Sequence, residues 1–256
     1  MSERFLGIDT SNYTTSAALV EPGMVLENRK KLLPVKPGEK GLRQSDAVFH
    51  HVRQLPEVLS PVLEVLTEPP KAIGVSLYPT TEKDSYMPCF LVGKNIAQLL
   101  GKAWNIPVEG FSHQQGHIAA ALYSAGKLDL LENPFLAFHV SGGTTEALFV
   151  KPDMDGMPQV TPAARSLDLK AGQAVDRVGV MLGLSFPCGP ELEKLALRWE
   201  GKLSYRPVLK GSDCSLSGIE NQCRALFDRG EPPEKIARFC LEAIASVLDK
   251  MCGRLL

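Results

Sequence analysis

The sequence lacks the marks of membrane and secreted proteins. None of its apolar runs approaches the roughly 20 residues that a membrane-spanning helix needs. The N-terminal Met-Ser-Glu-Arg leads directly into a strand-like apolar stretch, without the apolar core of a signal peptide. We therefore expect a cytoplasmic protein with no membrane partner.

Cysteine pairing and net charge are also uninformative. The six cysteines form no Cys-x-x-Cys pair and are too sparse for a disulfide scaffold, so we expect reduced, mostly buried thiols. A formal net charge of −1 gives no overall basic footprint for nucleic acid, although a neutral total can contain a basic patch on one face. With 44% hydrophobic and 22% charged residues, the composition is that of a globular domain, and it neither supports nor excludes a nucleic-acid partner.

The two halves of the chain repeat one order of elements. Each half opens with three short strand patterns, the first group beginning at Phe5 and the second at Phe135, and continues into helices. This repetition predicts an actin-like (ASKHA), duplicated ribonuclease H-like α/β fold with halves 1–132 and 133–256, in which a nucleotide binds between the halves. The second half should be incomplete, because the sequence reaches Leu256 before it supplies strand–helix pairs like those of the first half.

Apolar periodicity and turn residues locate the elements within each half. The expected strands cover 5–9, 17–20, 24–27, 72–77, the region near 108, 135–140, 146–150 and 163–167. The expected helices cover 46–65, 90–104, the helix that carries His113 and His117 and continues through 118–123, 171–182, 190–199, 219–229 and 233–252. Pro56 and Pro61 should bend or divide the first helix, since proline removes a hydrogen-bond donor and crowds the preceding turn.

Two histidines four residues apart, His113 and His117, are the sharpest chemical signal. Residues at i and i+4 share one helix face, so both imidazoles can hold one divalent metal, although such spacing also occurs without one. A zinc protease of the His-Glu-x-x-His type needs a glutamate beside the first histidine as general base. That position is Gln114, whose amide cannot take the proton, which argues against peptide hydrolysis.

Two turns have the composition of phosphate-binding hairpins. Gly7–Ser11 places Asp9 after the first strand, where a carboxylate approaches the metal and backbone amides meet phosphate in actin-like ATPases. Val140–Thr145 is the matching turn of the second half, and its adjacent Gly142 and Gly143 permit close approach of a phosphate. Taken singly, each is equally well explained as an ordinary turn.

A third segment connects two helices through Gly183 and restarts at Gly189 and Pro190. The bare Gly189 can admit a flat adenosine, with Asp176 accepting hydrogen bonds from ribose hydroxyls. The alternative is a tight helix–helix connection without a ligand.

These motifs together resemble the TsaD family, the tRNA threonylcarbamoyladenosine synthases once catalogued as O-sialoglycoprotein endopeptidases. The resemblance covers nearly the whole chain, and the motifs follow the family's order. They are Gly7–Ser11, His113–His117, Val140–Thr145, Ala171–Asp176, Pro187–Ala196 and Ser215–Ile219. The resemblance implies an acyltransferase that moves threonylcarbamoyl from threonylcarbamoyl-AMP to the tRNA adenosine next to the anticodon.

The resemblance also assigns roles to individual residues and implies partners. The implied roles are zinc or iron ligands for His113 and His117, catalysis for Asp9 and Ser11, and adenylate binding for His139, Val140, Ser141, Gly142, Gly143, Asp176 and Gly189. A divalent metal can polarise the carbamoyl carbonyl while AMP departs, so no protein nucleophile is required. The implied partners are threonylcarbamoyl-AMP or another adenine nucleotide, tRNA, and a protein of the same fold.

Several positions depart from the family's pattern. Asn12-Tyr13-Thr14 stands where the family has Cys-Asp-Glu, Asp9 and Gln115 stand where it has Glu, and Thr144 replaces a histidine. The family's third metal ligand would lie beyond Leu256, so we expect a weakly held metal. The alternative reading is a catalytically impaired paralogue that acts as a nucleotide-binding or regulatory partner protein.

Overall fold

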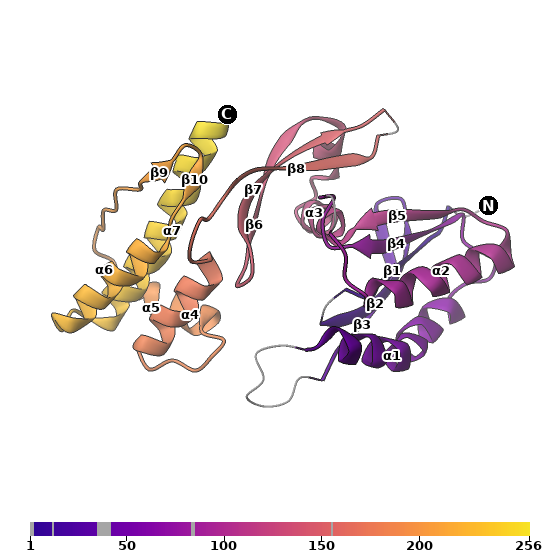
Figure 1. Cartoon of the computed structure of the whole chain (residues 1–256), viewed down its shortest axis with the longest axis horizontal. Coiled ribbons are helices and arrows are strands. Elements are labelled where there is room, and N and C mark those ends of the chain that lie inside the picture. The colour runs from indigo at the N-terminus through magenta and orange to yellow at the C-terminus, as the bar shows by residue number, and fades with distance from the viewer. Residues whose placement is uncertain (1–2, 12, 35–41, 83–84, 155) are drawn as a thin grey trace. The chain divides into compact units, whose positions relative to one another are not determined.

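The computed structural model describes residues 3–11, 13–34, 42–82, 85–154 and 156–256 (Figure 1). Asn12, one of the substituted motif positions, lies outside the described residues. The chain divides into two compact units, Met1–Leu130 and Leu131–Leu256. Each unit has its own hydrophobic core, so each is described by itself.

The N-terminal unit is built on a five-stranded sheet with the order β3-β2-β1-β4-β5. Its strands are β1 Phe5–Asp9, β2 Thr14–Glu21, β3 Met24–Leu32, β4 Ala72–Tyr78 and β5 Val108–Ser112. Strands β1, β2 and β3 are antiparallel neighbours, whereas β4 runs parallel to β1 and β5 parallel to β4. The carboxyl ends of β1, β4 and β5 therefore meet at one edge of the sheet.

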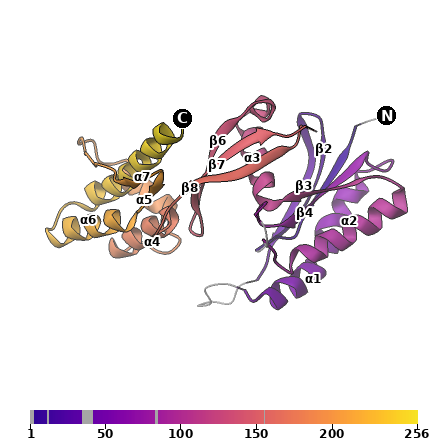
Figure 2. The same cartoon turned by 45° about the horizontal axis from the view of Figure 1, so that its top comes forward.

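Helices α1 Gln44–Glu64 and α2 Phe90–Trp104 pack against each other and against β2 and β4, and α3 His113–Ser124 follows β5 directly (Figures 1 and 2). A 3-10 turn at Leu128–Glu132 ends this part of the chain. The core contains Leu19, Val62 and Ile73, each fully buried.

Helix α1 is continuous through Pro56 and Pro61, so of the two predicted outcomes, a bend or a division, the division is wrong. Leu55, Val58 and Val62 recur at helical spacing and are buried. Each such side chain contributes about 1.5–3 kcal/mol of hydrophobic free energy, and with Leu59, which is also buried, the sum matches or exceeds the cost of about 3 kcal/mol per proline.

The C-terminal unit opens with an antiparallel sheet of order β6-β7-β8 and continues into helices. Its elements are β6 Phe135–Val140, β7 Thr145–Pro152, β8 Pro158–Arg165, α4 Ala171–Met181, α5 Gly189–Ala196, the short strands β9 Leu209–Lys210 and β10 Asp213–Cys214, α6 Ser217–Asp228 and α7 Pro233–Leu255. Within the described part of this unit, no strand takes the places of β4 and β5. The described residues of the second unit thus lack parallel strand–helix pairs like those that follow the three antiparallel strands of the first unit.

Strand β8 begins at Pro158, five residues before the predicted start. Pro158 and Pro162 argued against a strand in the sequence, because proline cannot donate a backbone hydrogen bond to a neighbouring strand. Both prolines are tolerated here because β8 pairs with β7 alone and is an edge strand.

Helix α7 is the centre of the second core and packs against α5 and α6 (Figures 1 and 2). Ile236, Cys240, Val247 and Met251 are fully buried along one of its faces. All six cysteines are free and five of them are buried, in agreement with the sequence prediction. Over the described residues, every helix is too short or too polar to span a membrane.

Candidate functional site: the Asp9–His113 turn and the Ser141 hairpin

The carboxylate of Asp9 gathers hydrogen bonds from three parts of the N-terminal unit. Its Oδ1 accepts from the backbone N–H of Ser11, at 2.7 Å. Its Oδ2 lies 2.9 Å from Nδ1 of His113 and also accepts from the hydroxyl of Ser76. These residues come together because β1, β4 and β5 end at the same edge of the sheet, and His113 directly follows β5.

Electrostatics keep Asp9 ionised. Burial alone would raise the pKa of Asp9, but the hydrogen bond and charge of His113, with hydrogen bonds from Ser11 and Ser76, lower that pKa to about 2. An ionised carboxylate can only accept hydrogen bonds, so the proton in this pair is on Nδ1 of His113.

A capping box starts α3 at His113, so the helix carries both histidines as predicted. The hydroxyl of Ser112 accepts from the N–H of Gln115 at 3.1 Å, and the Gln115 side chain accepts from the N–H of Ser112 at 2.7 Å. This motif uses Glu or Gln equally. The replacement of the family's glutamate by Gln115 therefore leaves the helix start intact.

The two histidines of the metal prediction lie together on α3. Their ring centroids are 4.1 Å apart with an interplanar angle of 64°, and Nε2 of His113 is 3.4 Å from the Ser11 hydroxyl. The pair suits two positions of a zinc or iron shell. Over the described ranges, no group of three or more His, Cys, Asp and Glu side chains is arranged to hold a metal. The described chain thus offers two imidazoles, one ligand fewer than a catalytic zinc site usually has.

Thr10, between the two predicted catalytic residues, is a structural anchor. Its buried hydroxyl donates to the carbonyl of Cys89 at 2.9 Å and accepts from the N–H of Gly93 at 3.0 Å. A Cβ on Gly93 would lie 2.9 Å from this hydroxyl oxygen. The glycine therefore lets α2 pack closely against the turn.

The turn between β6 and β7 is closed by its own hydroxyls. The hydroxyl of Ser141 accepts from the N–H groups of Gly143 and Thr144, at 3.2 and 3.0 Å. The hydroxyl of Thr145 accepts from the N–H of Ala171 at 2.8 Å and so ties the turn to α4. A phosphate at this turn would have to replace the Ser141 hydroxyl as acceptor.

Helix α4 begins directly against this turn. The N–H of Gly172 donates to the carbonyl of Ser141 at 3.0 Å. A Cβ on Gly172 would lie 2.5 Å from the backbone nitrogen of Gly142, so only glycine fits. The positive end of the α4 dipole therefore lies beside the turn, which favours an anionic ligand there.

Asp176 and Gly189 lie close together in the structure, but the Asp176 carboxylate accepts a hydrogen bond from the backbone. Its Oδ1 accepts from the N–H of Cys188, at 2.9 Å, at the start of α5. A Cβ on Gly179 would lie 2.3 Å from Cβ of Cys188, whereas a Cβ on Gly189 would meet nothing within 4 Å. Packing thus requires Gly179 but leaves open space beside Gly189.

The remaining predicted adenylate residues lie at the end of β6. Val140 is 43% exposed, and Nδ1 of His139 lies 3.7 Å from a carboxylate oxygen of Glu146 on β7. Sequence reasoning missed Glu146 and Ser76. A lone hydroxyl in the apolar pattern of β4 was the signal for Ser76.

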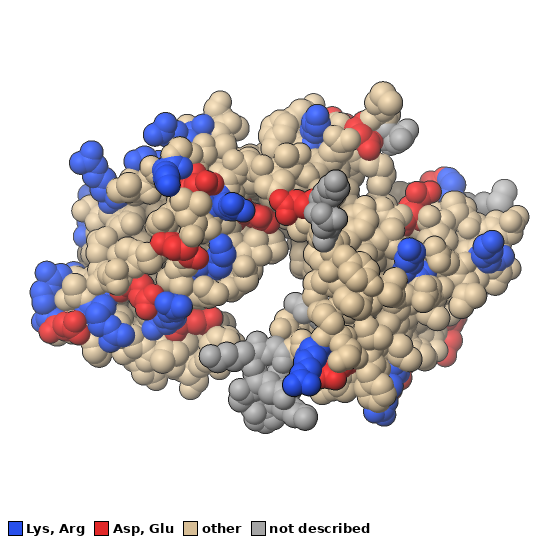
Figure 3. Space-filling view, in the orientation of Figure 1, with Lys and Arg blue, Asp and Glu red and all other residues tan. Residues whose placement is uncertain are grey.

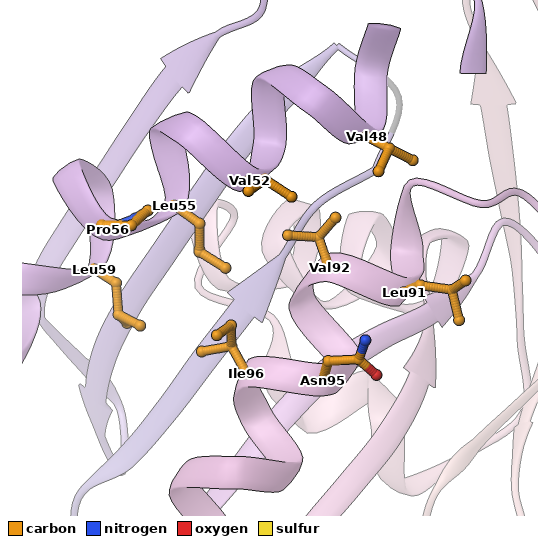
Figure 4. Close-up of a pocket in the computed structure, with 9 residues that line it drawn as sticks. All are labelled: Val48, Val52, Leu55, Pro56, Leu59, Leu91, Val92, Asn95 and Ile96. Carbon is orange, nitrogen blue, oxygen red and sulfur yellow. The ribbon is translucent and has the colours of Figure 1, made fainter. Parts of the chain in front are cut away.

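An apolar groove between α1 and α2 was not predicted. Figure 4 shows side chains of both helices around a volume of about 570 Å³. The lining residues are Val48, Val52, Leu55, Pro56, Leu59, Leu91, Val92, Asn95 and Ile96. Asn95 is the polar member of this set.

Charged side chains of both signs are mixed over the face drawn in Figure 3. Lys and Arg are interspersed with Asp and Glu there and form no single basic stripe.

Comparisons with known proteins address the family. Residues 84–256 match the model of the TsaD family, described as tRNA N6-adenosine threonylcarbamoyltransferase. The chain is 28% identical over 251 residues to a probable bifunctional tRNA threonylcarbamoyladenosine biosynthesis protein of Thermoplasma volcanium, a match that covers 98% of the chain and 45% of that protein. It is 29% identical over 251 residues to a tRNA N6-adenosine threonylcarbamoyltransferase of Pyrobaculum neutrophilum, covering 98% of the chain and 71% of that protein. The chain thus spans about half the length of the first relative.

The fold is shared with more distant proteins. The crystal structure of HypF from T. kodakarensis superposes with a TM-score of 0.57 at 11% identity, over 98% of this chain and 40% of that one. This similarity concerns the fold alone, which is the predicted actin-like α/β fold. Because the family model matches more than half of the sequence, this chain belongs to the TsaD family.

Proposed function

We propose that this chain takes part in the synthesis of threonylcarbamoyladenosine in tRNA and carries the transfer step. It would move threonylcarbamoyl from threonylcarbamoyl-AMP to the tRNA adenosine next to the anticodon. The observation that carries this proposal is the pair His113 and His117 on α3, with His113 held by the ionised Asp9. The match to the TsaD family model supports this chemistry among the many that actin-like folds carry.

The proposed metal site consists of His113 and His117. A bound zinc or iron ion supplies a Lewis acid for the carbamoyl carbonyl. Asp9 holds Nδ1 of His113 at 2.9 Å and thereby orients the ring, and a metal at Nε2 would displace the Ser11 hydroxyl, which lies 3.4 Å from that nitrogen. With two imidazoles from the described residues, we expect weak binding.

The proposed adenylate site lies in the C-terminal unit. The N–H groups of Gly143 and Thr144 and the start of α4 favour an anion at the Ser141 turn. Gly189 supports an adenosine position, because the space beside it is open and packing does not require a glycine there. His139 and Val140 border the same turn at the end of β6.

A transfer assay tests the proposal. The purified chain, loaded with zinc or iron, is incubated with threonylcarbamoyl-AMP and unmodified tRNA, and the nucleosides are quantified by mass spectrometry after digestion. We expect modified adenosine above the enzyme-free background and none from His113→Ala. Exposed Asp46 provides the control variant Asp46→Asn, which should retain activity. Absence of product from the wild-type chain would contradict the transfer proposal.

A second candidate role, partner binding, is favoured by the α1–α2 groove (Figure 4). Val52 and Leu91 line it and are 56% and 40% exposed, and Phe49 and Leu99 extend the apolar surface at 56% and 65%. Large exposed apolar surfaces with few charges are typical of protein interfaces. The partner we propose is a protein of the same fold, for which a second copy of this chain is the first case to test.

The mass of the chain in solution tests this second role. Sedimentation equilibrium should give the mass of a dimer for the wild-type chain and that of a monomer for Val52→Glu. Glu57→Gln, on the exposed side of α1, is the matched control and should leave the dimer intact. A monomeric wild-type chain at all concentrations would exclude the second copy.

A further inference from the structure

The sequence placed Asp9 where a carboxylate faces a metal or a phosphate, but the structure engages it elsewhere. A carboxylate oxygen offers about two lone-pair directions. Both directions of Asp9 Oδ2 are occupied, one by the Ser76 hydroxyl and one by Nδ1 of His113. Oδ1 accepts the N–H of Ser11 at 2.7 Å. The Asp9 side chain is 23% exposed, which leaves little room for a further ligand.

We propose that Asp9 is a positioning residue that fixes the tautomer of His113 and leaves Nε2 as the ligating nitrogen. In this arrangement Asp9 touches neither metal nor substrate. The metal part of this inference rests on the proposed function, whereas the tautomer part does not.

The supporting argument is geometric. A histidine that ligates a metal through one ring nitrogen commonly donates the other N–H to a carboxylate, which sets the ring's orientation and increases its basicity. The Asp9–His113 contact of 2.9 Å supplies this second bond. Its two members are held by separate elements, since Ser76 on β4 holds the carboxylate and the capping box of α3 holds the histidine backbone.

The arrangement also explains why aspartate, which has a shorter side chain than glutamate, occupies position 9. Asp9 sits in a pocket closed by Ser11 and Ser76, and its carboxylate reaches His113 while remaining at the end of β1. An acid that ligated the metal through Oδ2 would have to leave the Ser76 hydroxyl or Nδ1 of His113 without its acceptor, which costs about 1–3 kcal/mol for each buried group.

Metal titration is the first test. Zinc affinity is measured for the wild-type chain, Asp9→Asn, Asp9→Ala, His113→Ala and the control Asp46→Asn. Loss of an outer carboxylate typically weakens metal affinity about 10–100-fold, so we expect that loss in Asp9→Ala and a smaller one in Asp9→Asn, whose amide oxygen can still accept. His113→Ala should lose more, and Asp46→Asn nothing. Wild-type affinity in Asp9→Ala, or a loss equal to that of His113→Ala, would overturn the inference.

The second test needs no metal. Long-range proton–nitrogen correlation spectra of histidine-labelled protein at about pH 8, above the ordinary histidine pKa of about 6.5, report which ring nitrogen carries the proton. We expect His113 to be protonated at Nδ1 in the wild-type chain and to lose this preference in Asp9→Ala. Asp9→Asn serves if Asp9→Ala does not fold, as judged by circular dichroism, and should then show a weakened preference.

The two tests separate this inference from the proposed function. A wild-type chain that binds no metal but shows His113 protonated at Nδ1 would remove the metal proposal and retain the Asp9–His113 relation. A proton on Nε2 in the wild-type chain would overturn the inference, whatever the metal affinity.

Discussion

The turn after β1 and the turn after β6 hold matching places, each joining the first and second antiparallel strands of its unit. In the first, the ionised carboxylate of Asp9 draws donors from three parts of the unit and holds His113. In the second, the neutral hydroxyl of Ser141 accepts two N–H groups of its own turn. One turn thus orients a histidine through charge. In the second turn, the N–H donors bond to an uncharged hydroxyl, and an anionic ligand can replace that hydroxyl as their acceptor.

The largest expected effect concerns catalysis and involves positions in both turns. If this chain carries the proposed transfer, we expect it to be at least about 100-fold slower than the Pyrobaculum neutrophilum relative, because Tyr13, Thr14 and Thr144 stand where the resemblance to the family implies two acids and a histidine, and charged groups near a reacting centre commonly contribute to the rate. Initial rates of nucleoside formation measured in parallel check this. Tyr13→Asp combined with Thr14→Glu should raise the rate. Comparable rates for the two wild-type proteins would show that the substitutions are adaptations.

The two turns should differ in how their contribution to the free energy of unfolding depends on pH. The pKa of Asp9 is lowered from 3.8 to about 2 in the folded chain, so its contribution is complete above pH 3.8 and is lost as the pH falls toward 2. The free-energy gap between wild type and Asp9→Asn should therefore shrink by about 2 kcal/mol over that window.

Urea unfolding in a Trp199→Phe background measures this gap, because Trp104 on α2 then reports the N-terminal unit. Ser141→Ala, followed through Trp199 in a Trp104→Phe background, is the matched comparison and should show no such window. An unchanged Asp9→Asn gap between pH 4 and pH 2 would contradict the ion pair.

Each turn is packed by a helix glycine, and the two glycines should differ in their tolerance of alanine. A Cβ on Gly172 would lie 2.5 Å from the backbone nitrogen of Gly142, whereas a Cβ on Gly93 would lie 2.9 Å from the side-chain oxygen of Thr10. Backbone yields less easily than a side chain, so Gly172→Ala should cost about 1–3 kcal/mol and Gly93→Ala less. Thermal unfolding of the two variants measures this order, and the reverse order would show that the second turn is the more adaptable.

The smallest effect is expected for the closing hydroxyl of the second turn. Ser141→Ala removes one acceptor from Gly143 and Thr144, whose N–H groups can turn to water because the turn is partly exposed. We expect a loss of about 1 kcal/mol in the free energy of unfolding. A loss above about 3 kcal/mol would mean that these donors are inaccessible to water, and hence to a ligand.

Local patterns were sufficient for elements with strong periodicity. The predicted bounds of α2, 90–104, agree with the structure because its apolar residues repeat at helical spacing without interruption. The helix that carries His113 and His117 was predicted from their spacing, whereas the capping box of Ser112 and Gln115 that starts it was not. The two-residue strands β9 and β10 are too short to form a pattern.

The relations within the site could not be predicted from the sequence. His113 and His117 share a helix, so their proximity follows from spacing. The bond between Asp9 and His113 joins residues 104 positions apart and depends on β1, β4 and β5 being parallel neighbours. The bond from Asp176 to Cys188 likewise depends on how α4 meets α5.

Separate ligand titrations of two variants test most directly the claim that the first turn serves a metal and the second an adenylate. Zinc and AMP affinities are measured for the wild-type chain, for His113→Ala and for Gly189→Arg, with Gly253→Arg as a control at another glycine that has open space around it. We predict that His113→Ala loses zinc and retains AMP, that Gly189→Arg loses AMP and retains zinc, and that the control retains both. Equal zinc binding by His113→Ala and the wild-type chain, or undiminished AMP binding by Gly189→Arg, would contradict the account.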